Sequence, residues 1–244
     1  MPHYARTETL RLLRNRRYII FVVAFPVLLY LINANMYGRQ TDPGGVTYSV
    51  VIMVSMAAYG ALSAAMMSTA VPWATERQSG WLRQLQITPL PGRAVVATKL
   101  AVALLLVLPA LVLVGVVAVV QQGVALPVGT WVALLLALWL GALPFAALGL
   151  AIGSVLSADA AQPASLICVF GLAVGGGLWF PPEVLGESLR PFMELLPTFY
   201  YAALGRSLVA GHGLPLADVL VVLGWAAALG AAAAVLYRRA TVRA

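Results

Sequence analysis

Residues that could perform acid–base, nucleophilic or metal chemistry are few and far apart in this sequence. The histidines are His3 and His212, and the single cysteine is Cys168. Metal and haem sites need His, Cys or carboxylate ligands that converge, and Ser–His catalysis needs a histidine beside its serine. No such constellation occurs within an apolar stretch. The sequence therefore predicts no catalytic residue, no metal site and no cofactor bound by this chain.

ATP hydrolysis by the phosphate-cradling motif G-x-x-x-x-G-K-[ST] is also excluded. The only lysine, Lys99, follows Ala97-Thr98 and precedes Leu100, which does not fit that motif. Lys99 lies at the end of an apolar stretch, where reaching toward the membrane boundary is the simplest role for a lysine. We expect the chain not to be an enzyme by itself.

The composition indicates a membrane protein, because 62% of the residues are hydrophobic, 9% are charged and the mean hydropathy is +0.94. Six uncharged stretches are long enough to cross about 30 Å of hydrocarbon. They are residues 18–37, 46–71, 100–120, 131–152, 160–180 and 219–237. The sequence predicts an all-α polytopic protein with six transmembrane helices and one domain over residues 1–244.

The basic residues predict the orientation. Most of the 15 lie before the first span, between the second and third spans, or after the sixth. Lys and Arg in short loops are retained in the cytoplasm, so both termini are expected there. The net charge of +7 comes from these basic residues, which flank the spans and form no separate domain, so nucleic-acid binding is not expected. Because no carboxylate or basic residue lies between the ends of a span, ion-coupled transport is disfavoured and a partner would supply the energy.

The polar stretch "ERQSGWLRQLQITPLPGR", residues 76–93, separates the second and third spans. At 100° per residue, Trp81, Leu82 and Leu85 fall within one arc, which predicts a short amphipathic helix. Pro72 is expected to end the span before it, and Pro89 to end the helix itself. The periodicity fits a membrane-surface helix and a docking helix for another protein equally well.

Residues 181–214, between the last two spans, exceed what a simple hairpin requires. Pro191 and Pro197 divide them into short amphipathic pieces that could lie passively on the membrane surface. Small residues also recur four apart within the spans, which predicts close helix packing. These sets are Gly60-Ala64-Ser68, Gly149-Gly153 and Gly171-Gly175.

The segment "ATERQSGWLRQLQITPLPGRAVVATKL" resembles the first cytoplasmic loop of type-2 ATP-binding-cassette (ABC) exporter permeases. In that family Glu-Arg is followed by Gly, a Leu, and Thr-Pro-Leu before a basic residue. The matching positions are Glu76, Arg77, Gly80, Leu82, Leu85, Thr88, Pro89, Leu90 and Arg93. The stretches "LGLAIGSVLSADAAQ" and "GGGLWFPPEVLGESLRPFMELLPTFYYAALGRSLVAG" resemble the fourth-span exit and the last outer segment. Trp81 departs from the small or β-branched residue of many members.

The resemblance implies three sets of site residues. The first is an amphipathic cytoplasmic coupling helix that docks on the ATPase subunit, with Glu76, Arg77, Gly80, Trp81, Leu82, Leu85, Thr88 and Pro89. The second is an outer gate of short re-entrant helices between spans 5 and 6, with Pro181, Pro197, Phe199, Tyr200 and Arg206. The third is a substrate pathway along the second and fifth spans, with Tyr59, Met66, Met67 and Phe170, although ordinary packing also explains these four.

The resemblance further implies the permease subunit of an ATP-driven exporter in the cytoplasmic membrane of a bacterium. It would move a hydrophobic or amphiphilic small molecule, drug-like or antibiotic-like, outward. Its expected partners are two copies of an ABC ATP-binding subunit, which hold ATP and Mg, a second permease subunit, and membrane lipid. Alternatives are an exporter of a lipid or lipid-linked glycan, a stand-alone channel and an intramembrane enzyme.

Overall fold

The computed structural model describes residues 20–41, 45–80, 92–179 and 187–242, and nearly all of their regular structure is helical. The short π-helix η1 (Ile20–Ala24) continues directly into α3 (Phe25–Tyr37). The long helices that follow are α4 (Tyr48–Gln78), α6 (Gly92–Gln122), α7 (Val128–Leu140), α8 (Leu143–Val155), α9 (Ala158–Gly175) and α13 (Leu216–Val242). Between α9 and α13 lie η2 (Glu187–Leu189), α11 (Arg190–Met193) and α12 (Pro197–Val209).

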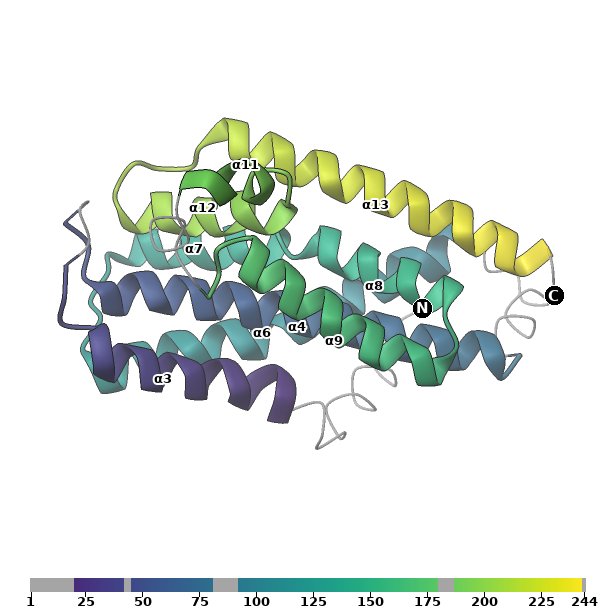
Figure 1. The fold of residues 1–244 in the computed structure, drawn as a ribbon, viewed down its shortest axis with the longest axis horizontal. Coiled ribbons are helices and arrows are strands. Elements are labelled where there is room, and N and C mark those ends of the chain that lie inside the picture. The colour runs from purple at the N-terminus through teal and green to yellow at the C-terminus, as the bar shows by residue number, and fades with distance from the viewer. Residues whose placement is uncertain (1–19, 42–44, 81–91, 180–186, 243–244) are drawn as a thin grey trace.

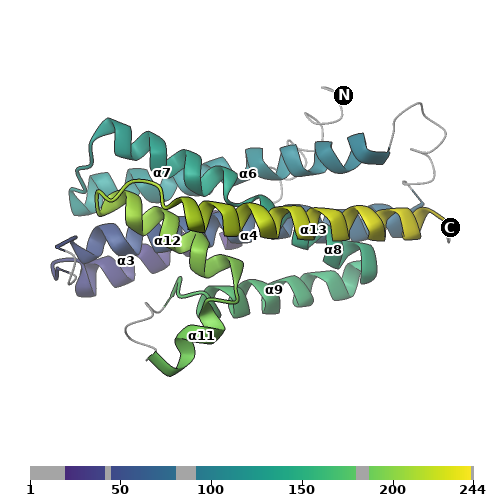
Figure 2. The same ribbon diagram turned by 90° about the horizontal axis from the view of Figure 1, so that it is seen from above.

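The long helices lie side by side in an elongated bundle (Figure 1). In it, α3 and α13 lie on opposite sides of α4. Seen from above, α6 and α7 lie on one side of α13 and α9 on the other (Figure 2). The segments α3–α4, α6–α7 and α12–α13 are joined at one end of the bundle, here called the Arg39 end. The end of α4, the turn between α8 and α9 and the end of α13 lie at the other, here called the Arg77 end.

Five helical segments are long and apolar enough to cross a membrane. They are Tyr48–Gln78, Ala94–Gln122, Val128–Val155, Ala158–Gly175 and Leu216–Tyr237. The remaining apolar helix, Val22–Tyr37, is shorter. The polytopic all-α architecture is thus confirmed, whereas a count of six spans stays a prediction because the first helix is shorter than the rest.

Helix α4 is the centre of the bundle, and α3, α6, α8, α9 and α12 all pack on it. Its side chains are buried around most of its circumference. Three of the hydroxyl groups that this buries, on Ser63, Ser68 and Thr69, donate to carbonyl groups of the same helix, for example from Ser63 to Tyr59 at 2.9 Å and from Thr69 to Ala65 at 3.0 Å. Small hydroxyl side chains can therefore occupy an apolar core without leaving a polar group unsatisfied.

The close approach of α8 to α4 depends on two of the predicted small residues. A Cβ added at Gly149 would overlap the Thr69 hydroxyl, and one added at Gly153 would overlap the carbonyl oxygen of Ala70. Packing through this pair is confirmed. Gly171, by contrast, has open space where a side chain would lie, so it serves no such contact here.

The boundaries of two predicted spans need correction. The second span does not end at Pro72, because α4 runs through that residue to Gln78. Proline is tolerated inside membrane helices when neighbouring helices hold the segment, and α8 packs along this part of α4. The fifth span ends at Gly175 rather than at residue 180. Gly177 has a φ of +73°, a left-handed conformation that ends the helical path.

The predicted fourth span is two helices instead of one. The chain turns at Gly141 and Ala142, and Pro144 lies in the first turn of α8. In an unbroken helix the Ala142 N–H would donate to the Leu138 carbonyl, but here it donates to Trp139 at 3.3 Å. The buried Tyr201 hydroxyl donates to the Leu138 carbonyl instead, at 2.6 Å. A side chain from α12 thus stabilises the break that proline introduces.

Candidate functional site

A buried ion pair joins α4 to α6 at the Arg77 end. Lys99 Nζ lies 2.5 Å from Glu76 Oε1, and the two residues are only 2% and 6% exposed. The prediction that Lys99 reaches to the membrane boundary is therefore wrong. Buried charges need a close partner of opposite sign, and each of these residues provides it for the other. Glu76 lies in the last turn of α4, and Lys99 lies about two turns inside α6, which begins at Gly92.

Arg77 holds the end of α8. Its Nε donates to the carbonyl of Gly153 at 3.3 Å and its Nη2 to that of Leu156 at 2.7 Å. Both acceptors belong to the last turn and C-cap of α8, where helix carbonyls lack intrahelical donors and carry partial negative charge. The guanidinium group supplies both the donors and the positive charge that this helix end favours.

Two further side chains of α4 reach the same place. Gln78 Oε1 accepts a hydrogen bond at 3.1 Å from the backbone N–H of Ala158, the first residue of α9. The Trp73 indole N–H donates to Ser154 Oγ on α8 at 2.8 Å, and its ring lies 5.7 Å from that of Tyr237 on α13. The last six residues of α4 thus contact α6, α8, α9 and α13.

The predicted docking residues divide into two groups. Glu76, Arg77 and Gly80 lie within the described part of the chain. The structure does not describe Trp81, Leu82, Leu85, Thr88 and Pro89. Docking stays a prediction for all eight. Glu76 and Arg77 were expected to contact the ATPase subunit, but the structure gives both side chains partners inside this chain.

The predicted outer gate centres on α12, and Pro181 lies outside the described residues. Helix α12 packs among α4, α7, α9 and α13 instead of lying on the surface. Pro197 begins the helix and is buried, while the rings of Phe199 and Tyr200 meet edge to face with centroids 5.3 Å apart. Arg206 donates to the carbonyl of Gly177 at 3.3 Å. These contacts disfavour a passive surface helix, and gating itself stays a prediction.

Sequence reasoning missed two residues that fix α12 in place. The Thr198 hydroxyl, fully buried, donates to the Leu172 carbonyl near the end of α9 at 2.9 Å. Tyr201 is also fully buried and lies edge to face with Phe145. The signal in the sequence was a polar residue directly after a helix-starting proline, but nothing local to it identifies the helix that it would contact.

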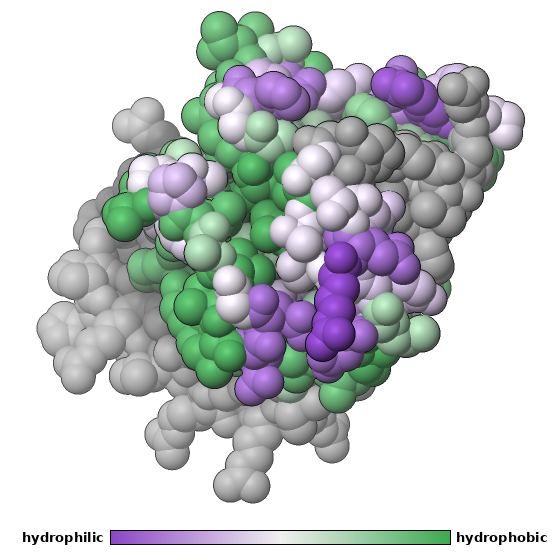
Figure 3. All heavy atoms as spheres, turned by 90° about the vertical axis from the view of Figure 1, so that its left-hand side faces the viewer, coloured by the Kyte–Doolittle hydropathy of each residue, from purple (hydrophilic) through white to green (hydrophobic). Residues whose placement is uncertain are grey.

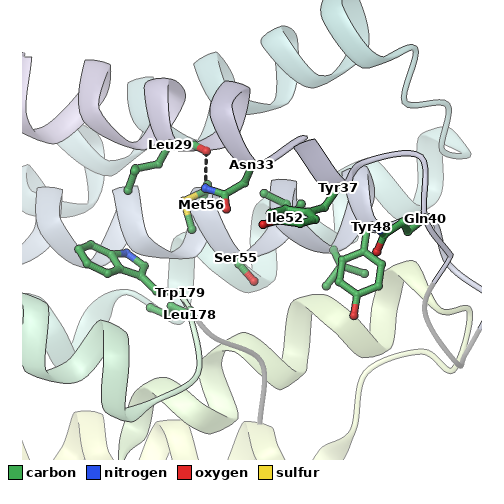
Figure 4. Close-up of a pocket in the computed structure, with 11 residues that line it drawn as sticks. Leu29, Asn33, Tyr37, Gln40, Tyr48, Ile52, Ser55, Met56, Leu178 and Trp179 are labelled. Carbon is green, nitrogen blue, oxygen red and sulfur yellow. Dashed lines mark hydrogen bonds between the residues drawn. The ribbon is translucent and has the colours of Figure 1, made fainter. Parts of the chain in front are cut away.

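A cavity of about 570 Å³ lies near the Arg39 end, between α3, α4 and the residues after α9. Its walls are mostly apolar and include no charged side chain, and Figure 4 shows the polar groups of Asn33, Gln40 and Ser55 around it. The lining residues are Leu29, Asn33, Tyr37, Gln40, Tyr48, Val51, Ile52, Ser55, Met56, Leu178 and Trp179. On the outer face at this end, hydrophilic patches alternate with hydrophobic surface (Figure 3).

None of the four residues predicted for the substrate pathway lines this cavity. Met66 is fully buried in the packing of α4, and Met67 is half-buried. Tyr59 and Phe170 each place their ring 5.3 Å from that of Trp179, which is a lining residue. Two of the four thus contact a residue of the cavity wall but do not line the cavity themselves. Trp179, after three glycines at the end of α9, was the residue that sequence reasoning missed.

Within the described residues, no three His, Cys, Asp or Glu side chains gather closely enough to hold a metal ion. The structure does bring together a buried ion pair and a network of hydrogen bonds at the Arg77 end, and it forms an uncharged cavity near the Arg39 end. The ion pair and the hydrogen bonds connect α4 to α6, α8 and α9, and the cavity offers a mostly apolar lining with amide and hydroxyl groups.

Comparison with known proteins gives two matches that cover most of the chain. Residues 39–237 match a family described as "ABC-2 family transporter protein". The chain is also 23% identical over 218 residues to a Bacillus subtilis (strain 168) protein named "Putative transport permease YvfS". That alignment covers 89% of each of the two proteins.

Proposed function

Because this chain belongs to the ABC-2 family of transporter proteins, we propose that it is the permease subunit of an ATP-driven exporter for a hydrophobic or amphiphilic small molecule. A drug-like or antibiotic-like compound is the substrate class that we favour. The Arg77 end faces the cytoplasm of a bacterium, and the compound leaves on the side of the Arg39 end.

The observation that carries this proposal is the position of the hydrogen-bond network. Glu76 and Lys99 join α4 to α6 on either side of the connection between these helices. We propose that the residues from Gly80 to Pro89 dock on the ATP-binding subunit. Movement of that connection would act on the end of α4, which is hydrogen-bonded to the end of α8 and to the first residue of α9. Energy from ATP and Mg on the partner therefore enters the bundle at the Arg77 end, where α4 contacts α6, α8 and α9 through polar side chains.

The cavity supports the substrate class. Its volume is within the range of sites that hold drug-sized ligands, and its polar lining consists of amide and hydroxyl groups. An uncharged lining disfavours an ion, since a charge taken from water needs a paired counter-charge. A second permease subunit completes the pathway, and α12 gates its outer end.

Reconstitution in liposomes tests the proposal. The permease and its ATP-binding subunit are expected to co-purify and to move a fluorescent amphiphile only when ATP and Mg are supplied on the side of the Arg77 end. An ATP-binding subunit without its Walker A lysine is the control and should give no transport. Movement without that subunit would identify a channel, chemical change of the compound would identify an enzyme, and transport of lipid alone would identify a lipid exporter.

A further inference from the structure

We propose that Glu76, Arg77 and Lys99 are positioning residues that transmit movement from the α4–α6 connection to α8 and α9, and that they are not contacts to the ATP-binding subunit. The inference rests on the proposed function, because it assigns the residues through which that subunit drives transport. It changes the role that sequence resemblance gave to Glu76 and Arg77.

The first step of the argument is that α4 and α6 move together at this end. The Glu76–Lys99 pair joins the last turn of α4 to α6 at 2.5 Å, with both side chains almost fully removed from solvent. Separating a buried ion pair leaves two uncompensated charges in an apolar environment, which is strongly unfavourable. A displacement of the connecting segment therefore moves the two helix ends as one unit.

The second step joins this unit to the turn between α8 and α9. Arg77 binds carbonyls of Gly153 and Leu156, before the turn, and Gln78 binds the N–H of Ala158, after it. The Trp73–Ser154 hydrogen bond and the close contact of Gly153 with Ala70 hold α8 against α4 over the preceding turns. Both sides of the turn thus follow the end of α4.

The third step carries the movement along α9 to the cavity. Helix α9 has 18 residues, so it spans about 27 Å, and its far end leads to Trp179 in the cavity wall. There the carbonyl of Leu172 accepts the Thr198 hydroxyl of α12. Helix α9 therefore has its first residue bonded to Gln78 and its last turn bonded to the helix that we propose as the outer gate.

The test measures ATP hydrolysis and transport separately in liposomes that contain the permease with its ATP-binding subunit. The variants are Glu76→Lys, Lys99→Glu and the double variant that exchanges the two charges. Each single variant is expected to keep the ATP-binding subunit bound but to lower the number of molecules transported per ATP at least tenfold. The double variant should recover most of the wild-type ratio. Gln122→Ala is the control, because it breaks the exposed Gln122–Asn35 hydrogen bond between α6 and α3, outside this network, and should leave the ratio unchanged.

Two results would overturn the inference. The first is an unchanged number of molecules transported per ATP in both single variants. The second is that Glu76→Lys loses the ATP-binding subunit and that binding returns only when Glu76 is restored, not in the double variant. If a single variant does not fold, Arg77→Gln replaces it, with Arg77→Lys as its conservative partner. Arg77→Gln should lower the ratio, and an unchanged ratio would again contradict the inference. A wild-type protein that neither binds the subunit nor transports would refute the proposed function instead.

A cross-link gives a second, independent readout. Cysteines replace Gln78 and Ala158 in a Cys168→Ala background and are joined by a short bis-maleimide whose spacer contains a disulfide that a reducing agent cleaves. If the end of α4 and the start of α9 move as one unit, the cross-linked protein should transport as well as the same variant without the linker. Transport that stops on cross-linking and resumes when the linker is cleaved would show that the two ends must separate, and it would refute the second step.

Discussion

Removing the Tyr201 hydroxyl should destabilise the bundle at the break between α7 and α8. That hydroxyl donates at 2.6 Å to the Leu138 carbonyl, which the Ala142 N–H no longer serves because it donates to Trp139. The Tyr201→Phe variant keeps the aromatic ring and its edge-to-face contact with Phe145. It loses only the hydrogen bond, so the effect reports on the carbonyl at the break.

The magnitude follows from the burial of both partners. A buried acceptor that loses its donor destabilises a protein by about 1–3 kcal/mol, and measured hydrogen bonds between membrane helices average about 0.6 kcal/mol. Because α12 supplies this donor at a broken helix, we expect a loss of about 1–2 kcal/mol in the free energy of unfolding. Unfolding in mixed detergent, followed by circular dichroism, measures the difference.

Tyr200→Phe is the matched control, since Tyr200 precedes Tyr201 on the same helix and is only partly buried. We expect Tyr200→Phe to change the stability by less than about 0.5 kcal/mol, the usual range for a substitution outside the core. Equal effects of the two substitutions, or no effect of Tyr201→Phe, would refute the idea that Tyr201 stabilises the helix break.

Three further predictions concern other parts of the bundle. Glu76→Gln alone should lower the free energy of unfolding by about 3–5 kcal/mol, because it leaves Lys99 buried beside an uncharged side chain. The double variant Glu76→Gln with Lys99→Met should recover much of this loss in the same unfolding assay. Gly153→Val should lower the unfolding temperature, since its side chain would overlap the α4 backbone, whereas Gly171→Ala, which faces open space, should not; equal temperatures would contradict this packing. Trp179→Ala should weaken binding of a transported compound, measured by equilibrium dialysis, at least tenfold more than Trp131→Ala, which lies outside the cavity; equal losses would remove the cavity as the binding site.

Features that depend on local sequence could be predicted. Long uncharged stretches predicted the five helical segments that are long and apolar enough to cross a membrane. The Gly149-Gly153 spacing predicted a close helix contact that the structure confirms. The family was also predictable, because its signature residues lie close together in residues 76–93.

Features that depend on which helices meet could not be predicted. Pro72 usually ends a helix in water, but packing against α8 keeps α4 continuous. Glu76 and Lys99 are 23 residues apart, a separation that no helical period connects, so each was assigned a surface role. Trp179 and Tyr201 likewise acquire their partners only when α9 and α12 fold back on α4 and α7.

The all-round burial of α4 has a consequence for directed evolution of this protein. A helix with one lipid-facing side accepts many substitutions there, but α4 is enclosed by other helices and has little such side to vary. Helix α13 is largely exposed along its length and leaves a wide surface on which apolar residues can be exchanged for one another. New substrate preferences should therefore be selected by libraries that randomise the α3 wall of the cavity and keep the sequence of α4 fixed.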